Sequence, residues 1–136
     1  MKQKSTKGEK VSVLLVEDEE LIRETTKRML EHLGYEVHSS ENGRNAVEAL
    51  KCRQSGFSCV ILDLTMPEMS GEDVYREIRK IDSVIPVILS SGHSEQDSIR
   101  NFPEKDIAGF LQKPYLMESL DILLKKTVEK SQNYHS

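Results

Sequence analysis

Side chains that can ligate a cation, accept a phosphoryl group or neutralise charge follow four short apolar runs in this chain. In chain order they are Glu17 with Asp18, Asp63, Ser90 with Ser91, and Lys113. If the runs are parallel strands of one sheet, their carboxyl ends meet at the edge where open α/β sheets bind ligands. Carboxylates packed together repel one another unless a cation offsets their charge. The set therefore predicts a site for a divalent metal and a phosphoryl group.

The elements that must position these side chains alternate between strand and helix from residue 11 onward. Glycine and proline mark several ends, such as Gly34 after the first helical pattern and Pro103 after the fourth. The expected strands are residues 11–16, 35–39, 58–62, 86–91 and 108–112. The expected helices are residues 21–33, 43–55, 71–81, 94–102 and 118–130.

This alternation predicts the fold class. Strand–helix–strand units cross over with one hand and pack their helices back onto the sheet. The prediction is an α/β protein, a (βα)5 doubly wound domain with a parallel five-stranded sheet.

Composition narrows the classes of function that are possible for this chain. The chain has 136 residues, enough for one domain, with 37% apolar and 31% charged residues. A net charge of −4 without a long basic stretch argues against nucleic-acid binding. No apolar stretch approaches membrane-spanning length, so we expect no membrane contact and a cytoplasmic location. Cys52 and Cys59 match no metal-ligand spacing and receive no role.

Four motifs surround the reactive side chains in a fixed order. They are Leu-Val-Glu-Asp-Glu at 15–19, Leu-Asp-Leu-Thr-Met-Pro-Glu-Met-Ser-Gly at 62–71, Pro-Val-Ile-Leu-Ser-Ser-Gly at 86–92, and Gly-Phe-Leu-Gln-Lys-Pro-Tyr at 109–115. With these motifs the chain resembles the receiver domains of two-component signalling, which accept phosphate from a histidine kinase. The resemblance covers residues 11–130 and implies the flavodoxin-like receiver fold with strand order 2-1-3-4-5. We expect residues 1–10 to form a flexible N-terminal arm and residues 131–136 a disordered tail.

The resemblance implies a metal site and a phosphate acceptor. Asp63 is the expected acceptor, because a carboxylate ionised at neutral pH is already a nucleophile. Asp18 and Asp63 are expected to ligate Mg²⁺ directly, with the backbone carbonyl of Thr65 as a third protein oxygen. Glu17 stands where Asp is commoner, so direct and water-mediated ligation both stay open for it. Mn²⁺ is expected to substitute for Mg²⁺.

The resemblance also implies a counter-charge and a switch. Lys113 is expected to pair with Asp63 at rest and with a phosphoryl oxygen after transfer. Alternation along the strand lets only one of Ser90 and Ser91 face the site. The resemblance implies Ser91, because the family motif places the switch hydroxyl five residues after Pro86 and just before a small residue. Phe110 is the expected switch aromatic, with an ordinary core aromatic as the open alternative.

Two further positions and one segment are singled out by comparison with the family. Thr65 and His93 occupy positions that modulate dephosphorylation, and ordinary loop roles remain open for both. Residues 101–107 depart from the usual small-residue ending of the fourth helix. We therefore expect that helix to be short or mobile, although the surface formed with the last strand and last helix is the expected readout face.

The implied function is that of a phosphoacceptor domain in a phosphorelay, which is no turnover enzyme by itself. Expected partners are a histidine kinase or a histidine phosphotransfer domain and an unknown effector, and a weak homodimer is compatible with the family. A receiver of a hybrid sensor histidine kinase and a stand-alone response regulator both remain open. The alternative is a Mg²⁺-dependent aspartate-nucleophile phosphatase. Such phosphatases carry a second Asp two residues after the nucleophile, where this chain has Thr65.

Overall fold

The sheet is the centre of the fold. The computed structural model describes residues 11–52, 56–100, 102 and 107–135. Five parallel strands pair in the order β2-β1-β3-β4-β5. They are β1 (Ser12–Val16), β2 (Glu36–Ser40), β3 (Cys59–Asp63), β4 (Val87–Ser91) and β5 (Ile107–Gln112). The predicted fold class and strand order are confirmed.

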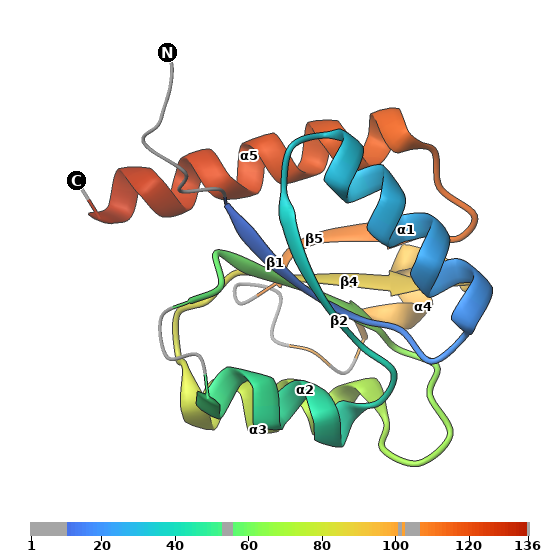
Figure 1. Ribbon diagram of the computed structural model, residues 1–136. Coiled ribbons are helices and arrows are strands. Elements are labelled where there is room, and N and C mark those ends of the chain that lie inside the picture. The colour runs from blue at the N-terminus through green and yellow to red at the C-terminus, as the bar shows by residue number, and fades with distance from the viewer. Residues whose placement is uncertain (1–10, 53–55, 101, 103–106, 136) are drawn as a thin grey trace.

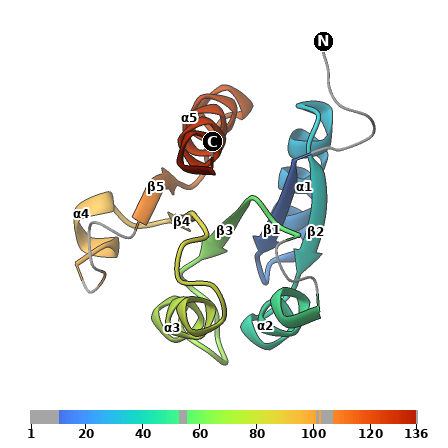
Figure 2. The same ribbon diagram turned by 90° about the vertical axis from the view of Figure 1, so that its left-hand side faces the viewer.

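Helices cover both faces of the sheet (Figure 1). They are α1 (Glu20–His32), α2 (Gly43–Cys52), α3 (Gly71–Ile81), α4 (Glu95–Ser98) and α5 (Met117–His135). Viewed along the strands, α1 and α5 lie on one side, and α2 and α3 lie on the other (Figure 2). One apolar cluster fills each interface, and Leu14 and Leu15 point into different clusters. Adjacent strand residues point to opposite faces, so one strand contributes to both clusters.

The three central strands have no polar face. Every residue of β1, β3 and β4 is buried, whereas the edge strand β2 alternates between exposed and less exposed residues. A parallel strand covered by helices on both sides must be apolar almost throughout, and an edge strand need not be. The polar exceptions in the centre are therefore informative, and Asp63 and Ser91 are two of them.

Local signals set two helix boundaries. Gly34 adopts a φ of 100° just after α1, a conformation that costs glycine little. Ser70 caps α3, because its hydroxyl oxygen accepts a hydrogen bond from the Asp73 N–H at 3.1 Å. This cap fixes the end of the loop that leads away from Asp63.

Two helices differ in length from the patterns in the sequence. α4 is a single turn, Glu95–Ser98, capped by the Ser94 hydroxyl, which confirms the expectation of a short fourth helix although the apolar pattern extends to residue 102. It buries none of its own residues, so packing does not support a longer helix. α5 continues to His135, so the backbone of 131–135 is helical where we expected a disordered tail. The expected arm, residues 1–10, and Ser136 lie outside the described residues.

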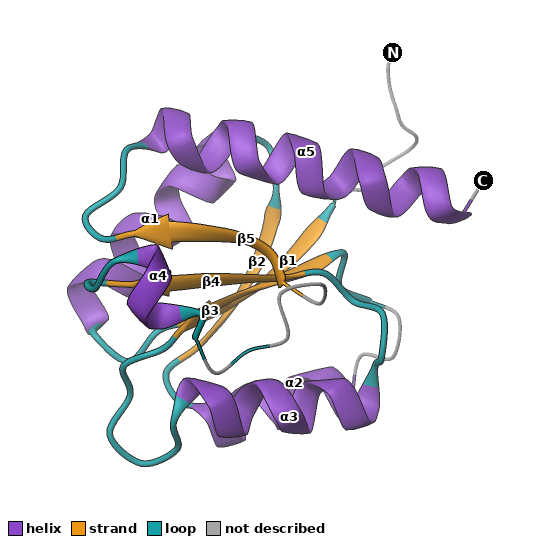
Figure 3. Cartoon of the chain, turned by 180° about the vertical axis from the view of Figure 1, so that it is seen from behind, coloured by secondary structure: helices purple, strands orange, loops and turns teal. Residues whose placement is uncertain are grey.

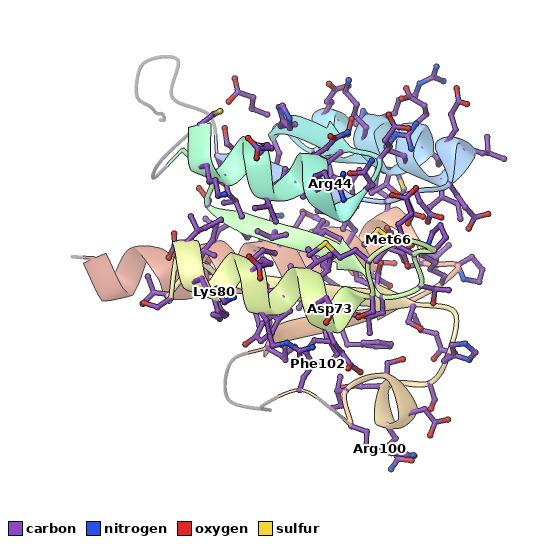
Figure 4. All side chains as sticks on the ribbon, turned by 90° about the horizontal axis from the view of Figure 1, so that it is seen from below. Arg44, Met66, Asp73, Lys80, Arg100 and Phe102 are labelled. Atoms are coloured by element: carbon purple, nitrogen blue, oxygen red, sulfur yellow. The ribbon has the colours of Figure 1, made fainter. Side chains whose placement is uncertain are left out.

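The segment after α4 is anchored by an aromatic ring. Phe102 is buried, and its ring meets the edge of Tyr75 on α3 with centroids 5.3 Å apart. The Arg79 guanidinium carbon lies 5.0 Å from the centroid of the Tyr75 ring. The labelled Phe102 side chain lies between α3 and α4 in Figure 4, and Figure 3 shows α4 beside β4 and β5 from behind. The buried Phe102 ring therefore packs the chain onto the core just after α4, which buries none of its own residues.

No helix in the described part of the chain is both long and apolar enough to cross a bilayer.

Gly71 allows α3 to approach the β3–α3 loop, which leads to a first prediction. A Cβ at Gly71 would lie 2.7 Å from the Leu64 Cα and 2.5 Å from its Cδ2, whereas a Cβ at Gly92 would meet no atom of the described residues within 4 Å. We expect Gly71→Ala to lower the free energy of unfolding by about 1 to 3 kcal/mol, despite the better helix propensity of alanine. Gly92→Ala is the matched control and should change it by less than about 0.5 kcal/mol. Denaturant titration measures both, and equal values for the two variants would contradict the packing argument.

Candidate functional site

The sheet order brings three carboxylates to one place. Glu17 and Asp18 follow β1, and Asp63 ends the adjacent β3. One carboxylate oxygen from each of the three residues lies within 4.8 Å of the others. Within the described ranges this is the one group of at least three His, Cys, Asp or Glu side chains close enough to hold a metal ion. The prediction that these carboxylates converge is therefore confirmed in geometry.

Asp63 has two inequivalent oxygens. The residue is 1% exposed. Its Oδ1 accepts a hydrogen bond from the Thr65 N–H at 3.2 Å and lies 3.1 Å from the Lys113 Nζ. Its Oδ2 is buried and has no hydrogen-bond partner among the described residues. A buried carboxylate oxygen without a partner is costly, and such groups point to function.

Lys113 bridges two carboxylates. Its Nζ lies 2.8 Å from Glu17 Oε1, closer than to Asp63. The main chain positions it, because the Lys113 N–H donates to the Ser91 carbonyl at 2.7 Å, and the Lys113–Pro114 peptide is cis. The Tyr115 and Thr26 hydroxyls share a hydrogen bond of 3.1 Å that joins this loop to α1. The sequence indicated a pair with Asp63 alone, and only the structure places Glu17 in the same ion-pair network.

The site shifts the pKa of its own groups. Burial raises the pKa of Asp63 to about 7, and the negative charge of Glu17 adds to the effect, while Lys113 and the Thr65 N–H oppose it. For Lys113, burial lowers the pKa, but the hydrogen bond to Glu17 and the charge of Asp63 outweigh burial and leave the pKa raised. Without a cation, the site therefore holds its carboxylates at an electrostatic cost.

The two serines of β4 occupy different environments. Ser90 is paired with Asp63 in the sheet register and is buried. Ser91 lines a pocket of about 230 Å³ with Thr65, Gly71 and His93, between the β3–α3 loop and α4. Its Oγ accepts a hydrogen bond from the His93 N–H at 3.0 Å. The strand thus directs Ser91, and not Ser90, into this pocket beside the site.

Phe110 and two loop residues complete the predicted set. Phe110 is paired with Leu89 in the sheet and packs, partly buried, against the α2–α3 side core. Thr65 and His93 are exposed and line the same pocket as Ser91. The Thr65 side chain is therefore near the site while its N–H already bonds Asp63.

One contact at the site has no sequence signal. The Arg23 Nη1 donates to the carbonyls of Glu17, at 3.0 Å, and of Asp18, at 3.3 Å. An arginine on a surface helix is ordinary in sequence, and only the path of the chain aims this one at the turn after β1.

Known proteins are similar to this chain in sequence and in architecture. The chain is 38% identical over 119 residues to the sensor kinase CckA of Brucella abortus (strain 2308), covering 88% of this chain and 13% of the kinase. It is 39% identical over 118 residues to the transcriptional regulatory protein YkoG of Bacillus subtilis (strain 168), covering 82% of this chain and 48% of that protein. The chain thus spans about half or less of the length of these relatives.

Solved structures agree with the fold. A response regulator receiver domain protein from Clostridium thermocellum has a TM-score of 0.85 and 27% identity, covering 91% of this chain and 98% of that chain. The receiver domain of the sensor histidine kinase PA1611 from Pseudomonas aeruginosa PAO1, solved with magnesium coordinated in its active-site cleft, has a TM-score of 0.79. Its identity is 24%, and the match covers 89% of this chain and 99% of that chain. The family model of the response regulator receiver domain matches residues 13–125. The chain therefore belongs to the response regulator receiver domain family of two-component systems.

Proposed function

We propose that this chain accepts a phosphoryl group on Asp63, with Mg²⁺, from the phosphohistidine of a histidine kinase or a histidine phosphotransfer domain. The observation that carries the proposal is the asymmetry of the Asp63 carboxylate. Oδ1 is held by Lys113 and the Thr65 N–H, while Oδ2 is buried without a partner among the described residues. The carboxylate is thus oriented by one oxygen and leaves the other free to react or to ligate.

The residues present fit a divalent cation. Three carboxylate oxygens lie within 4.8 Å of one another, and hard oxygen ligands of this kind suit Mg²⁺. Asp18 and Asp63 would hold the ion directly, with the Thr65 carbonyl, and Glu17 directly or through water. When bound, Mg²⁺ would neutralise the carboxylates and the incoming phosphoryl oxygens. The magnesium described for the PA1611 receiver is consistent with this assignment.

The transfer itself is a displacement at phosphorus. A bond forms from an Asp63 carboxylate oxygen to phosphorus, and the phosphorus–nitrogen bond of the phosphohistidine breaks. The electron pair of that bond returns to the imidazole nitrogen of the donor. Positioning and charge neutralisation are the main contributions a protein makes to this reaction. The side chain of Lys113, held by Glu17 at 2.8 Å, is placed to donate to a phosphoryl oxygen.

Phosphorylation of Asp63 would change the surroundings of Ser91 at the end of β4 and, through it, of α4. Phosphorylation adds about −1.5 to −2 charge and new acceptor oxygens beside Ser91. The Ser91 hydroxyl now accepts from the His93 N–H and could turn to donate to a phosphoryl oxygen. Because His93 leads directly into α4, a change at Ser91 would be transmitted to that single turn. Whether the chain works within a sensor kinase or as a separate regulator, the same local change would be the signal.

Acetyl phosphate tests the proposal without a cognate kinase. We expect intact-mass spectrometry to show one added phosphoryl group on the protein in Mg²⁺ and none in excess chelator. Mn²⁺ should replace Mg²⁺ in this assay. Equal labelling with and without the divalent cation would contradict the metal assignment, and steady release of phosphate from phosphate monoesters would favour a phosphatase.

The assignment of the switch gives a separate prediction. Ser91→Ala should accept phosphate from acetyl phosphate but lose most of the chemical-shift change that phosphorylation causes in residues 92–100. Ser90→Ala is the matched control, because its side chain is placed outside the pocket, and it should keep that change. Amide NMR spectra before and after phosphorylation measure both. A lost response in Ser90→Ala and a full response in Ser91→Ala would reverse the assignment.

A further inference from the structure

The side chain of Arg23 lines a pocket together with His38, Ser40 and Asn45. From this position it contacts the turn between β1 and α1. Its Nη1 donates to the Glu17 carbonyl at 3.0 Å and to the Asp18 carbonyl at 3.3 Å. The Arg23 N–H also donates to the Glu19 carbonyl at 2.8 Å in the first turn of α1. One residue therefore contacts the carbonyls of three consecutive residues at the start of the site.

Two of these three carbonyls belong to residues whose side chains form the acidic cluster. The carbonyls of Glu17 and Asp18 are turned to Arg23, and their carboxylates meet that of Asp63 within 4.8 Å. Two further bonds restrain the turn, from the Glu17 N–H to the Ser40 carbonyl at 3.0 Å and from the Glu19 N–H to Glu17 Oε2 at 3.2 Å. Rotation of either peptide plane would break a bond to Arg23. The directions of both Cα–Cβ bonds are thus held.

Arg23 acts on the backbone and not as a counter-charge. Across residues 11–52, 56–100, 102 and 107–135, the ion pairs of the acidic site are those of Lys113, and none joins Arg23 to a carboxylate. A guanidinium presents several N–H donors in a fixed plane, whereas the ammonium of a lysine is a compact point charge on a shorter side chain. The guanidinium of Arg23 is therefore suited to hydrogen bonding with two neighbouring carbonyl oxygens.

We infer that Arg23 is a positioning residue that presets the Glu17–Asp18 pair for a divalent cation and so sets the affinity of the site for Mg²⁺. The inference rests on the proposed function. Groups that orient metal ligands without touching the metal typically change metal affinity by about 10- to 100-fold when removed. Loosening this turn should act in the same way, because the carboxylates would have to be ordered when the ion binds.

Magnesium titration by calorimetry on the metal-free full chain tests the inference. We expect Arg23→Met to raise the dissociation constant for Mg²⁺ roughly tenfold or more, and Arg23→Lys to weaken binding although it keeps the charge. Arg28→Met is the matched control, because Arg28 is an exposed arginine on the same helix, and it should bind as the wild type does. Wild-type affinity in either Arg23 variant would overturn the inference.

A second measurement separates positioning from general loss of structure. With acetyl phosphate, Arg23→Met should need a higher Mg²⁺ concentration for half-maximal labelling but reach a rate near that of the wild type at saturating Mg²⁺. A lower rate at saturation with an unchanged half-saturating concentration would mean a structural defect and would overturn the inference. If the wild type itself binds no Mg²⁺ and is not labelled, the proposed function fails. If the wild type binds and the Arg23 variants match it, only the role of Arg23 fails.

Discussion

Replacement of Asp63 by asparagine is expected to abolish phosphorylation. Asparagine keeps the size of the side chain but removes the anionic oxygen that would attack phosphorus. With acetyl phosphate and saturating Mg²⁺, the wild type should gain one phosphoryl group that is stable in acid and labile in base. Asp63→Asn should show at least a 100-fold lower rate, a loss of about 3 kcal/mol or more of transition-state stabilisation.

A second aspartate provides the control for this experiment. Asp121 lies on α5, where its Oδ2 pairs with Lys125 at 3.3 Å. Asp121→Asn makes the same chemical change away from the site, so its labelling should equal that of the wild type. Labelling of Asp63→Asn at the wild-type rate would place the acceptor elsewhere and refute the proposed function.

The same substitution should make the metal-free protein more stable at high pH. The pKa of Asp63 is raised from 3.8 to about 7, with burial as the largest cause. Between these two values the folded protein binds more protons than the unfolded chain, so the free energy of unfolding falls as pH rises toward 7. Above pH 7 the buried carboxylate is ionised and its cost is fully present. Asparagine is neutral throughout and avoids this cost.

Denaturant titrations in chelator at about pH 8 and pH 5 measure this effect. We expect the stability of Asp63→Asn relative to the wild type to be greatest at pH 8 and to shrink by roughly 2 to 3 kcal/mol at pH 5. Saturating Mg²⁺ should stabilise the wild type more than the variant at pH 8. A constant difference across this pH range would show that Asp63 does not titrate near 7.

The cost of the site has a consequence for signalling. A domain that holds Glu17 and Asp63 against one ammonium is under electrostatic strain without a cation. Under the proposed function, metal binding and phosphorylation would act on this strained arrangement, next to an α4 that is a single turn and buries none of its own residues. Coupling of about 1 to 3 kcal/mol would be enough for a useful change in partner affinity.

The sequence alone determined which residues meet at the site and on which fold. The apolar run before Asp63 identifies a strand buried on both faces, and a parallel arrangement places the reactive ends of the strands on one edge. The order of the strands followed from the resemblance to receiver domains. Period-two alternation lets only one of Ser90 and Ser91 face the site, and Gly71 marks the start of α3. These features follow from local stereochemistry and burial, which a single sequence records directly, whereas the choice of Ser91 followed from the family motif.

Only the tertiary structure decided how those residues are connected. The bridge from Lys113 to Glu17 joins segments far apart in the chain. The lack of a partner for Asp63 Oδ2 among the described residues and the contact of Arg23 with the β1–α1 turn are likewise absent from the local pattern. The sequence already predicted a short fourth helix, but the packing of Phe102 against Tyr75 just after it is seen only in the structure. Such contacts depend on side-chain positions to within tenths of an ångström, and residue spacing in the sequence carries no record of those positions.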